Sequence, residues 1–167
     1  VYSLTGVSAI SWSHSGSFIA VSQSDDQDDR SAVWTMNVQC LLDGLVCHPQ
    51  RELLVAGAWG ADWSSDDRQV VYTGGFGAVT IIDVATKQIV RTLGDDYRSC
   101  GEIEWSPTGQ YLAFYCPDKL QVYNLANDTV IRPVPDWVED YGWLPDADTL
   151  IYIKCYRDQG LCKTPFL

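Results

Sequence analysis

The chain has 167 residues, of which 46% are hydrophobic, and a formal net charge of −11. This length is enough for one domain with a buried core. The acidic charge repels phosphate backbones, and no apolar run approaches the ~18 residues of a membrane helix, so we expect neither nucleic-acid binding nor membrane insertion.

In chain order, residues 1–6 (VYSLTG) read as one short strand, and a repeating pattern follows. A short strand ends in tryptophan, a tight turn comes next, and a second strand follows the turn. This pattern occurs at 10–21, 61–72, 103–114 and 141–152, with its tryptophans at Trp12, Trp63, Trp105 and Trp143. These tryptophans are separated by 51, 42 and 38 residues. A period near ~40–45 residues is typical of propeller blades.

Further strands complete the repeat. Third strands are predicted at 32–38, 78–84 and 120–125, and the clearest whole unit runs from Gly101 to Pro133. Turn residues stand between runs of β-branched and aromatic residues. The chain resembles the WD40 family and the related TolB-like propellers with WSPDG repeats, and 74–93 is the best match. This resemblance implies an all-β propeller and says little about function.

We expect about four WD40-like blades in a single propeller domain or segment, at about 7–47, 53–93, 100–134 and 137–167. The fourth blade lacks an outermost strand, and strand 1–6 is predicted to complete it, because such closure protects sheet edges. Three arrangements stay open: a closed four-bladed ring, an eight-bladed ring of two chains, and part of a longer propeller.

The six cysteines fall into three local pairs, each across a predicted hairpin. Opposed residues of antiparallel strands lie within disulfide range. We therefore predict three hairpin disulfides, with buried free thiols or a zinc site as weaker alternatives. The expected pairs are Cys40–Cys47 about Asp43-Gly44, Cys155–Cys162 about 157–160, and Cys100–Cys116, which sits one residue off opposition.

Disulfides indicate an oxidising compartment, so we expect a secreted or cell-surface protein. Asn127-Asp128-Thr129 is an N-glycosylation acceptor in a predicted turn and agrees with this location.

The sequence offers little for catalysis, metal binding or a cofactor. The acidic loop 25–29 fails the EF-hand pattern, because Arg30 stands where glycine is required. His14 and His48 are the only histidines, and no nucleophile or phosphate-loop motif occurs. We expect no enzyme, no metal and no cofactor.

Aromatic residues divide into two groups. The four repeated tryptophans are expected to pack between blades. Trp59 and Trp137 fall near blade junctions, and with Tyr97 and Tyr141 they are the candidate interface residues. Packing in the core is the alternative role for these four residues, and it is the one we favour.

The predicted function is a non-enzymatic extracellular or cell-surface propeller that binds proteins, including copies of itself, or serves a structural role. Two alternatives are the accessory propeller of a secreted hydrolase or peptidase, and a lectin-like carbohydrate binder.

Overall fold

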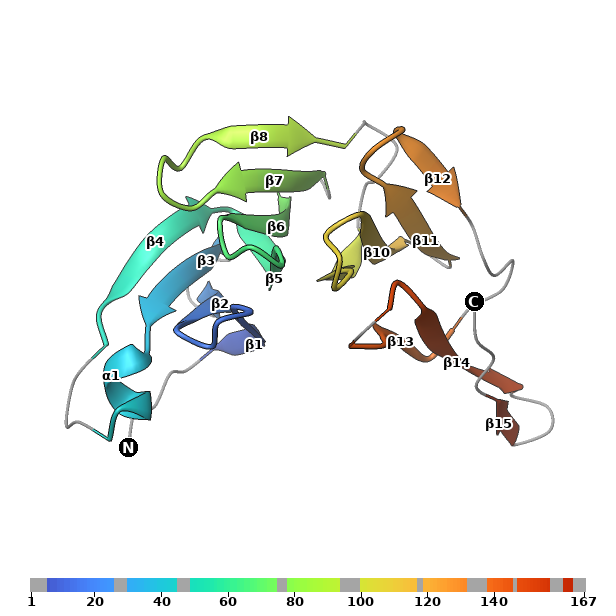
Figure 1. Cartoon of the computed structure of the whole chain (residues 1–167), viewed down its shortest axis with the longest axis horizontal. Helices are drawn as coiled ribbons and strands as arrows, with labels where there is room; N and C mark the ends of the chain where they lie inside the picture. The colour runs from blue at the N-terminus through green and yellow to red at the C-terminus, as the bar shows by residue number, and fades with distance from the viewer. Residues whose placement is uncertain are drawn as a thin grey trace.

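A computed structural model describes residues 6–25, 30–44, 49–74, 78–93, 100–116, 119–131, 138–145, 147–156 and 161–163. They form four antiparallel sheets, each with its strands in chain order. Figure 1 shows these sheets as successive blades of an arc. The expected all-β propeller blades are confirmed.

Blades one to three have four strands each, and blade four has three described strands. Blade one contains β1 (Val7–Trp12), β2 (Phe18–Asp25), β3 (Arg30–Asn37) and β4 (Arg51–Ala56); blade two contains β5 (Ala58–Trp63), β6 (Gln69–Gly74), β7 (Val79–Asp83) and β8 (Ile89–Thr92). Blade three contains β9 (Gly101–Trp105), β10 (Tyr111–Cys116), β11 (Lys119–Asn124) and β12 (Thr129–Ile131); blade four contains β13 (Asp140–Trp143), β14 (Leu150–Tyr156) and β15 (Leu161–Lys163).

The serine that follows each of the first three repeat tryptophans closes the first turn of its blade. The hydroxyl oxygens of Ser13, Ser64 and Ser106 accept backbone N–H groups five residues ahead, at 3.0–3.1 Å. All three serines are buried. A buried hydroxyl needs such a partner, so the Trp-Ser pair fixes the turn as well as the strand end.

The outer strand of blade one is a correction to the sequence prediction. Instead of a hairpin about Asp43-Gly44, the short helix α1 (Gln39–Leu42) follows β3, and the outer strand is β4. Asn37 Oδ1 accepts the Gln39 N–H at 3.0 Å, which starts the helical turn. Cys40 is disulfide-bonded, and its expected partner Cys47 lies outside the described residues.

A bulge explains how the offset cysteines of blade three meet. Between Phe114 and Tyr115 the β9–β10 register shifts by one residue, at Glu102, whose φ is +46°. The shift turns the one-residue offset into direct opposition. Cys100 and Cys116 form a disulfide.

Adjacent blades bury apolar faces against each other. We call the sheet face that carries the repeat tryptophan the leading face, and the opposite face the trailing face. Trp63 and Val70 of blade two pack against Ala20 and Val33 of blade one. Trp105 of blade three packs likewise on blade two, and the leading face of blade four packs on blade three. Each leading face therefore covers the trailing face of the blade before it.

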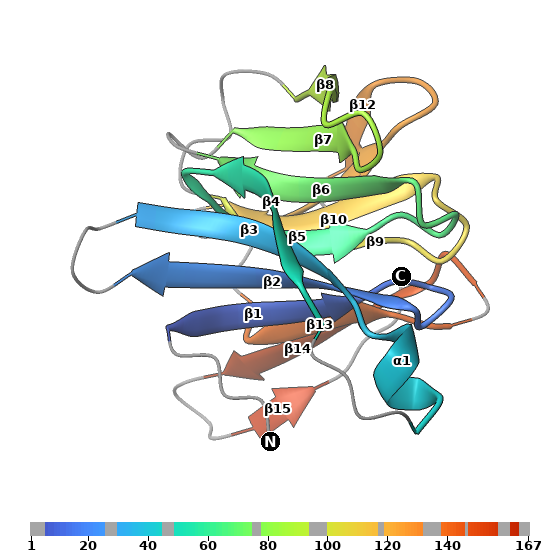
Figure 2. The same cartoon turned by 90° about the vertical axis from the view of Figure 1, so that its left-hand side faces the viewer.

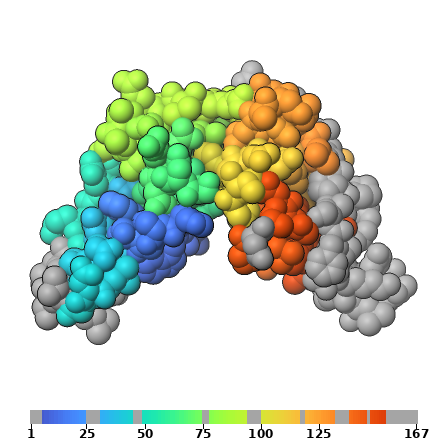
Figure 3. Space-filling view, viewed as in Figure 1, coloured from blue at the N-terminus to red at the C-terminus, as the bar shows by residue number. Residues whose placement is uncertain are grey.

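The arc is open between its two ends. Figures 1 and 3 show blades one and four at opposite ends of the arc, separated by a gap. The predicted closing strand is outside the described residues except for Gly6, whose carbonyl accepts the Ser24 N–H at 2.8 Å. Gly6 thus extends the pairing of its own blade.

A carboxylate joins the turns of blades one and two. Asp67 accepts the backbone N–H groups of His14 at 2.5 Å and Ser15 at 2.9 Å. Its φ is +59°, and Gly16 and Gly109 hold the equivalent left-handed position in blades one and three. Asp148 of blade four also reaches the turn of the blade before it, where it accepts the backbone N–H of Thr108 at 3.3 Å and the Thr108 hydroxyl.

Removing the Cys100–Cys116 disulfide tests its contribution to stability. Cys100→Ala with Cys116→Ala should lower the free energy of unfolding by about 3 kcal/mol, because the bond closes a loop of this length in the unfolded chain. Urea unfolding without reductant measures the change, and intact mass with and without reductant verifies that the variant has the same other disulfides as the parent. A loss below about 1 kcal/mol would contradict this role.

Substitution of Asp67 tests the link between blades. Asp67→Gly should lower the free energy of unfolding by about 1 kcal/mol, because two hydrogen bonds are lost while glycine accepts the left-handed backbone. Asp67→Asn keeps one acceptor oxygen and should lose less than Asp67→Gly. Equal stability of all three chains in urea would show that the contact contributes nothing.

Candidate functional site

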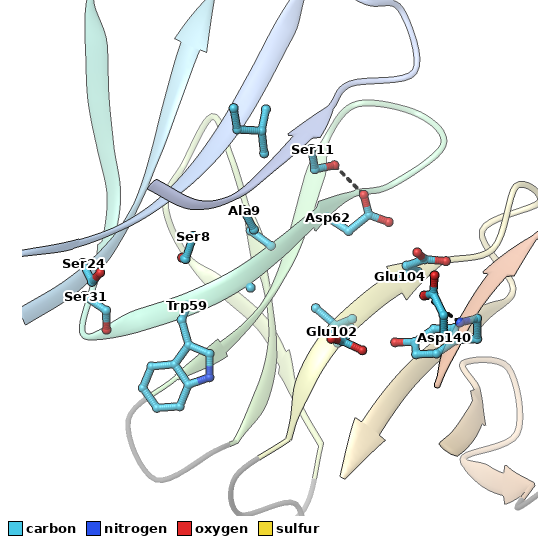
Figure 4. A pocket seen from close by; sticks show the side chains of 15 residues that line it. Ser8, Ala9, Ser11, Ser24, Ser31, Trp59, Asp62, Glu102, Glu104 and Asp140 are labelled. Carbon is cyan, nitrogen blue, oxygen red and sulfur yellow. Dashed lines mark hydrogen bonds between the residues drawn. The ribbon is translucent and has the colours of Figure 1, made fainter. Parts of the chain in front are cut away.

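The inner strands β1, β5, β9 and β13 line a groove of about 840 Å³ along the concave side of the arc. Figure 3 shows the hollow between the arms of the arc, and Figure 4 shows the groove lining. A narrower space of about 360 Å³ on the turn side shares Asp62 and Glu104 with it. A groove of this size is the default candidate for a binding site.

Four carboxylates dominate the groove, and none of the described lining residues is basic. They come from three neighbouring inner strands: Asp62 from β5, Glu102 and Glu104 from β9, and Asp140 from β13. Figure 4 shows these side chains on the groove side of their strands, with Trp59 set apart at one end. The groove therefore has a strongly negative wall.

Asp62 has a structural task. Its carboxylate accepts the Ser11 hydroxyl at 2.5 Å and the Trp105 backbone N–H at 2.7 Å. Burial raises the pKa of Asp62 above its ordinary value, although these hydrogen bonds act in the opposite direction. One carboxylate thus joins the inner strands of blades one, two and three.

Glu104 is the most perturbed carboxylate of the wall. Burial, together with the charges of Asp62, Asp140 and Glu102, raises the pKa of Glu104 to about 7. The side chain therefore carries a proton for part of the time at neutral pH. An approaching cation would favour the charged form, because an opposite charge offsets the cost of burial.

Of the interface residues predicted from sequence, Trp59 and Tyr141 both line the groove. Trp59 is half-buried at its rim. Tyr141 is 8% exposed and donates its hydroxyl to the Ala113 carbonyl at 3.3 Å, so it mainly packs blade four on blade three. Tyr97 and Trp137 lie outside the described residues.

The remaining predicted sites lie away from the groove. Asn127 is exposed in the turn between β11 and β12, where its Oδ1 accepts the Thr129 hydroxyl at 2.6 Å. Cys155 and Cys162 are directly paired in the β14–β15 register, and their side chains are outside the described part. Most of the acidic loop 25–29 is outside it too.

The acidic wall was missed in the sequence, although a signal for it exists. The residues immediately before the first three repeat tryptophans are Ser11, Asp62 and Glu104. Alternation along a strand places each of them on the face opposite its tryptophan, next to the following blade. Reading this one position across the repeats would have found half of the wall.

Within the described ranges, no three His, Cys, Asp or Glu side chains are arranged to hold a metal ion. No described helix is both long and apolar enough to span a membrane.

Comparisons with known proteins give the fold. TolB from Acinetobacter baumannii superposes with a TM-score of 0.71 at 16% identity, over 95% of this chain and 43% of TolB. The fold is a TolB-like β-propeller. A putative TolB from Agrobacterium tumefaciens superposes with a TM-score of 0.68 at 15% identity, over 92% of this chain and 62% of the putative TolB. A chain of the mitotic checkpoint complex superposes with a TM-score of 0.64 at 17% identity, over 92% of this chain and 45% of the other.

The resemblance to TolB-like and WD40-like propellers is thus confirmed for the fold. No family model and no curated protein matches the chain. The chain spans about half the length of the solved structures that it matches.

The raised pKa of Glu104 predicts a pH-dependent effect of Glu104→Gln. Since this pKa lies above the ordinary value of 4.5, the folded chain binds the extra proton, and stability is lost as pH rises from about 4.5 to about 7. Glu104→Gln does not lose this stability, because glutamine does not titrate. Its melting temperature relative to the parent should therefore rise across this window and level off above it.

Thermal unfolding at a series of pH values measures this difference. Glu139→Gln, an exposed glutamate beside β13, controls for the loss of one acidic group. A constant difference between Glu104→Gln and the parent across the window would show that Glu104 has no raised pKa.

Proposed function

We propose that the chain is a non-enzymatic protein-interaction propeller of an oxidising, extracellular compartment, and that its inner groove binds a positively charged segment of a partner protein. The observation that carries this proposal is the wall of four carboxylates without a described basic residue. Lysine or arginine side chains entering the groove would form charge-assisted hydrogen bonds with these acids, which are stronger than bonds between neutral groups.

The geometry supports an extended ligand. The groove runs along four inner strands and continues into the narrower space beside the repeat tryptophans. Trp59 at the rim offers an aromatic face to a cationic or aromatic side chain. Glu104 would release its proton when a cation binds, so binding should strengthen as pH rises through about 7.

The bonded cysteines support the proposal of an oxidising compartment. Cys100–Cys116 and the bonded Cys40 leave no free cysteine among the described residues. Disulfides of this kind persist in secreted proteins and are rare in the cytosol. Asn127 is exposed in its turn and accessible to glycosylation.

A labelled oligo-arginine peptide tests the groove by fluorescence anisotropy. Glu104→Gln with Asp140→Asn should weaken binding about tenfold, or about 1.4 kcal/mol. The control Asp43→Asn with Glu52→Gln makes the same change in net charge at exposed sites outside the groove lining. Equal loss in both variants would mean that the peptide senses only the overall charge of −11, and the proposal would fail.

A carbohydrate ligand is the second candidate, favoured by Trp59 beside polar groups in the same groove. A glycan array on the parent chain and on Trp59→Ala separates the two. Glycan binding that disappears in Trp59→Ala, with no peptide binding, would replace the first proposal.

A further inference from the structure

One N-glycosylation acceptor occurs in the sequence, and the structure holds it in an exposed turn. Of the three asparagines, Asn37, Asn124 and Asn127, only Asn127 is followed two residues later by serine or threonine. Asn127 and Thr129 are both exposed between β11 and β12. The Asn127 Oδ1 accepts the Thr129 hydroxyl at 2.6 Å. Among the described residues its Nδ2, the nitrogen to which a glycan is attached, has no hydrogen-bond acceptor.

The turn does not need this acceptor, because blade two forms the same turn without it. Residues 83–88 join β7 to β8 as residues 124–129 join β11 to β12. In both turns the first carbonyl accepts the N–H four residues ahead, at 2.8 and 3.1 Å, and that fifth residue has a φ of +57° or +58°. Blade two places Thr86 and Gln88 at the two acceptor positions. The backbone of the turn therefore does not explain the Asn-X-Thr pattern of blade three.

Asp128, the middle residue of the acceptor, fixes the turn beside blade two. Its carboxylate accepts the Tyr123 hydroxyl at 2.7 Å and pairs with Arg91 of β8. The Arg91 guanidinium also donates to the Leu125 carbonyl at 3.0 Å. Figures 1 and 2 show β8 and β12 side by side at the outer rim of the arc. A group attached to Asn127 therefore stands at the rim where blades two and three meet.

Three exposed apolar side chains gather at this rim, and we call them the rim patch. Ile89 and Val90 of β8 are 63% and 53% exposed, and Ile131 of β12 is 51% exposed. Val90 directly precedes Arg91, and Ile131 lies two residues beyond Thr129, which is about 7 Å along a strand. Exposed apolar residues on outer strands favour association between sheet edges, and natural proteins cover such edges.

We infer that Asn127 carries an N-linked glycan and that this glycan covers the rim patch. The inference rests on the proposed extracellular compartment, because such glycans are attached during secretion. In the transfer, Nδ2 bonds to the anomeric carbon of a lipid-diphosphate oligosaccharide, the bond from that carbon to the diphosphate breaks, and one Nδ2 proton passes to the leaving lipid diphosphate. The product is a bulky, solubilising group at the surface. Asn127 is not part of the groove lining, so the groove stays open.

Intact mass spectrometry of the chain secreted by cultured eukaryotic cells tests the modification. The mass should exceed the chain mass of 18.6 kDa by one oligosaccharide. Asn127→Gln and Thr129→Ala should lose this addition, whereas Thr129→Ser should keep it, because serine also completes the acceptor. An unmodified mass for the secreted, folded parent would overturn the inference.

The same secreted sample separates this inference from the proposed function. Masses with and without reductant show whether the disulfides have formed, and the labelled oligo-arginine peptide measures binding in the groove. The glycosylated parent and Asn127→Gln should bind the peptide equally, because the turn lies outside the groove lining. An oxidised chain that binds the peptide and lacks the glycan would contradict only the inference. A glycosylated chain that does not bind the peptide would contradict only the proposed groove ligand.

Precipitation by ammonium sulfate tests whether the glycan covers the rim patch, because sulfate strengthens apolar association. Ile89→Thr with Ile131→Thr should raise the salt concentration needed for precipitation in the Asn127→Gln background and leave it nearly unchanged in the glycosylated chain. The control pair Leu41→Ser with Leu42→Ser, at 46% and 56% exposed positions of α1, should have the same effect in both backgrounds. Far-UV circular dichroism verifies that each variant is folded. An equal effect of the rim substitutions in both backgrounds would show that the glycan does not cover the patch.

Discussion

Face-to-face burial of the blades is the constraint on which the rest of the structure depends. A sheet whose two faces are both apolar must be covered on both sides. Val70 and Val71 are neighbours in β6, point to opposite faces, and are both fully buried. Leu112 and Ala113 repeat this in β10. Since each large apolar side chain contributes about 1.5–3 kcal/mol on burial, blades two and three are stable because they have neighbours on both sides.

The same packing creates the groove. Blades that meet face to face in an arc bring their innermost strands together on the concave side, where the chain places small residues and carboxylates. Asp62 accepts hydrogen bonds from both neighbouring blades and is part of the scaffold. Glu104 stands beside it, and burial next to other acids raises the pKa of Glu104 to about 7. The stable part of the fold thus holds a carboxylate whose charge depends on its surroundings.

The fold could be predicted from the sequence because its signals are local. Trp-Ser followed by a turn specifies a strand end, and repetition at near-regular spacing specifies blades. The sequence predictions are wrong where contacts between segments distant in the chain determine the structure. Asp43-Gly44 reads as a hairpin, yet the pairing of β3 with β4 places the outer strand after a helical turn. Trp12 reads like the other repeat tryptophans, which are expected to pack between blades, yet it is 56% exposed, whereas Trp63 and Trp105 are 5% and 8% exposed. The acidic wall depends on which strands become neighbours, although Asp62 and Glu104 share a position in the repeat.

Urea unfolding of Leu112→Ala tests most directly whether face-to-face burial between blades governs this molecule. Leu112 is fully buried in the contact between blades two and three, whereas Leu53 of β4 is 41% exposed. The account predicts that Leu112→Ala lowers the free energy of unfolding by about 2–5 kcal/mol and that Leu53→Ala lowers it by much less. Equal losses in the two variants would contradict the account.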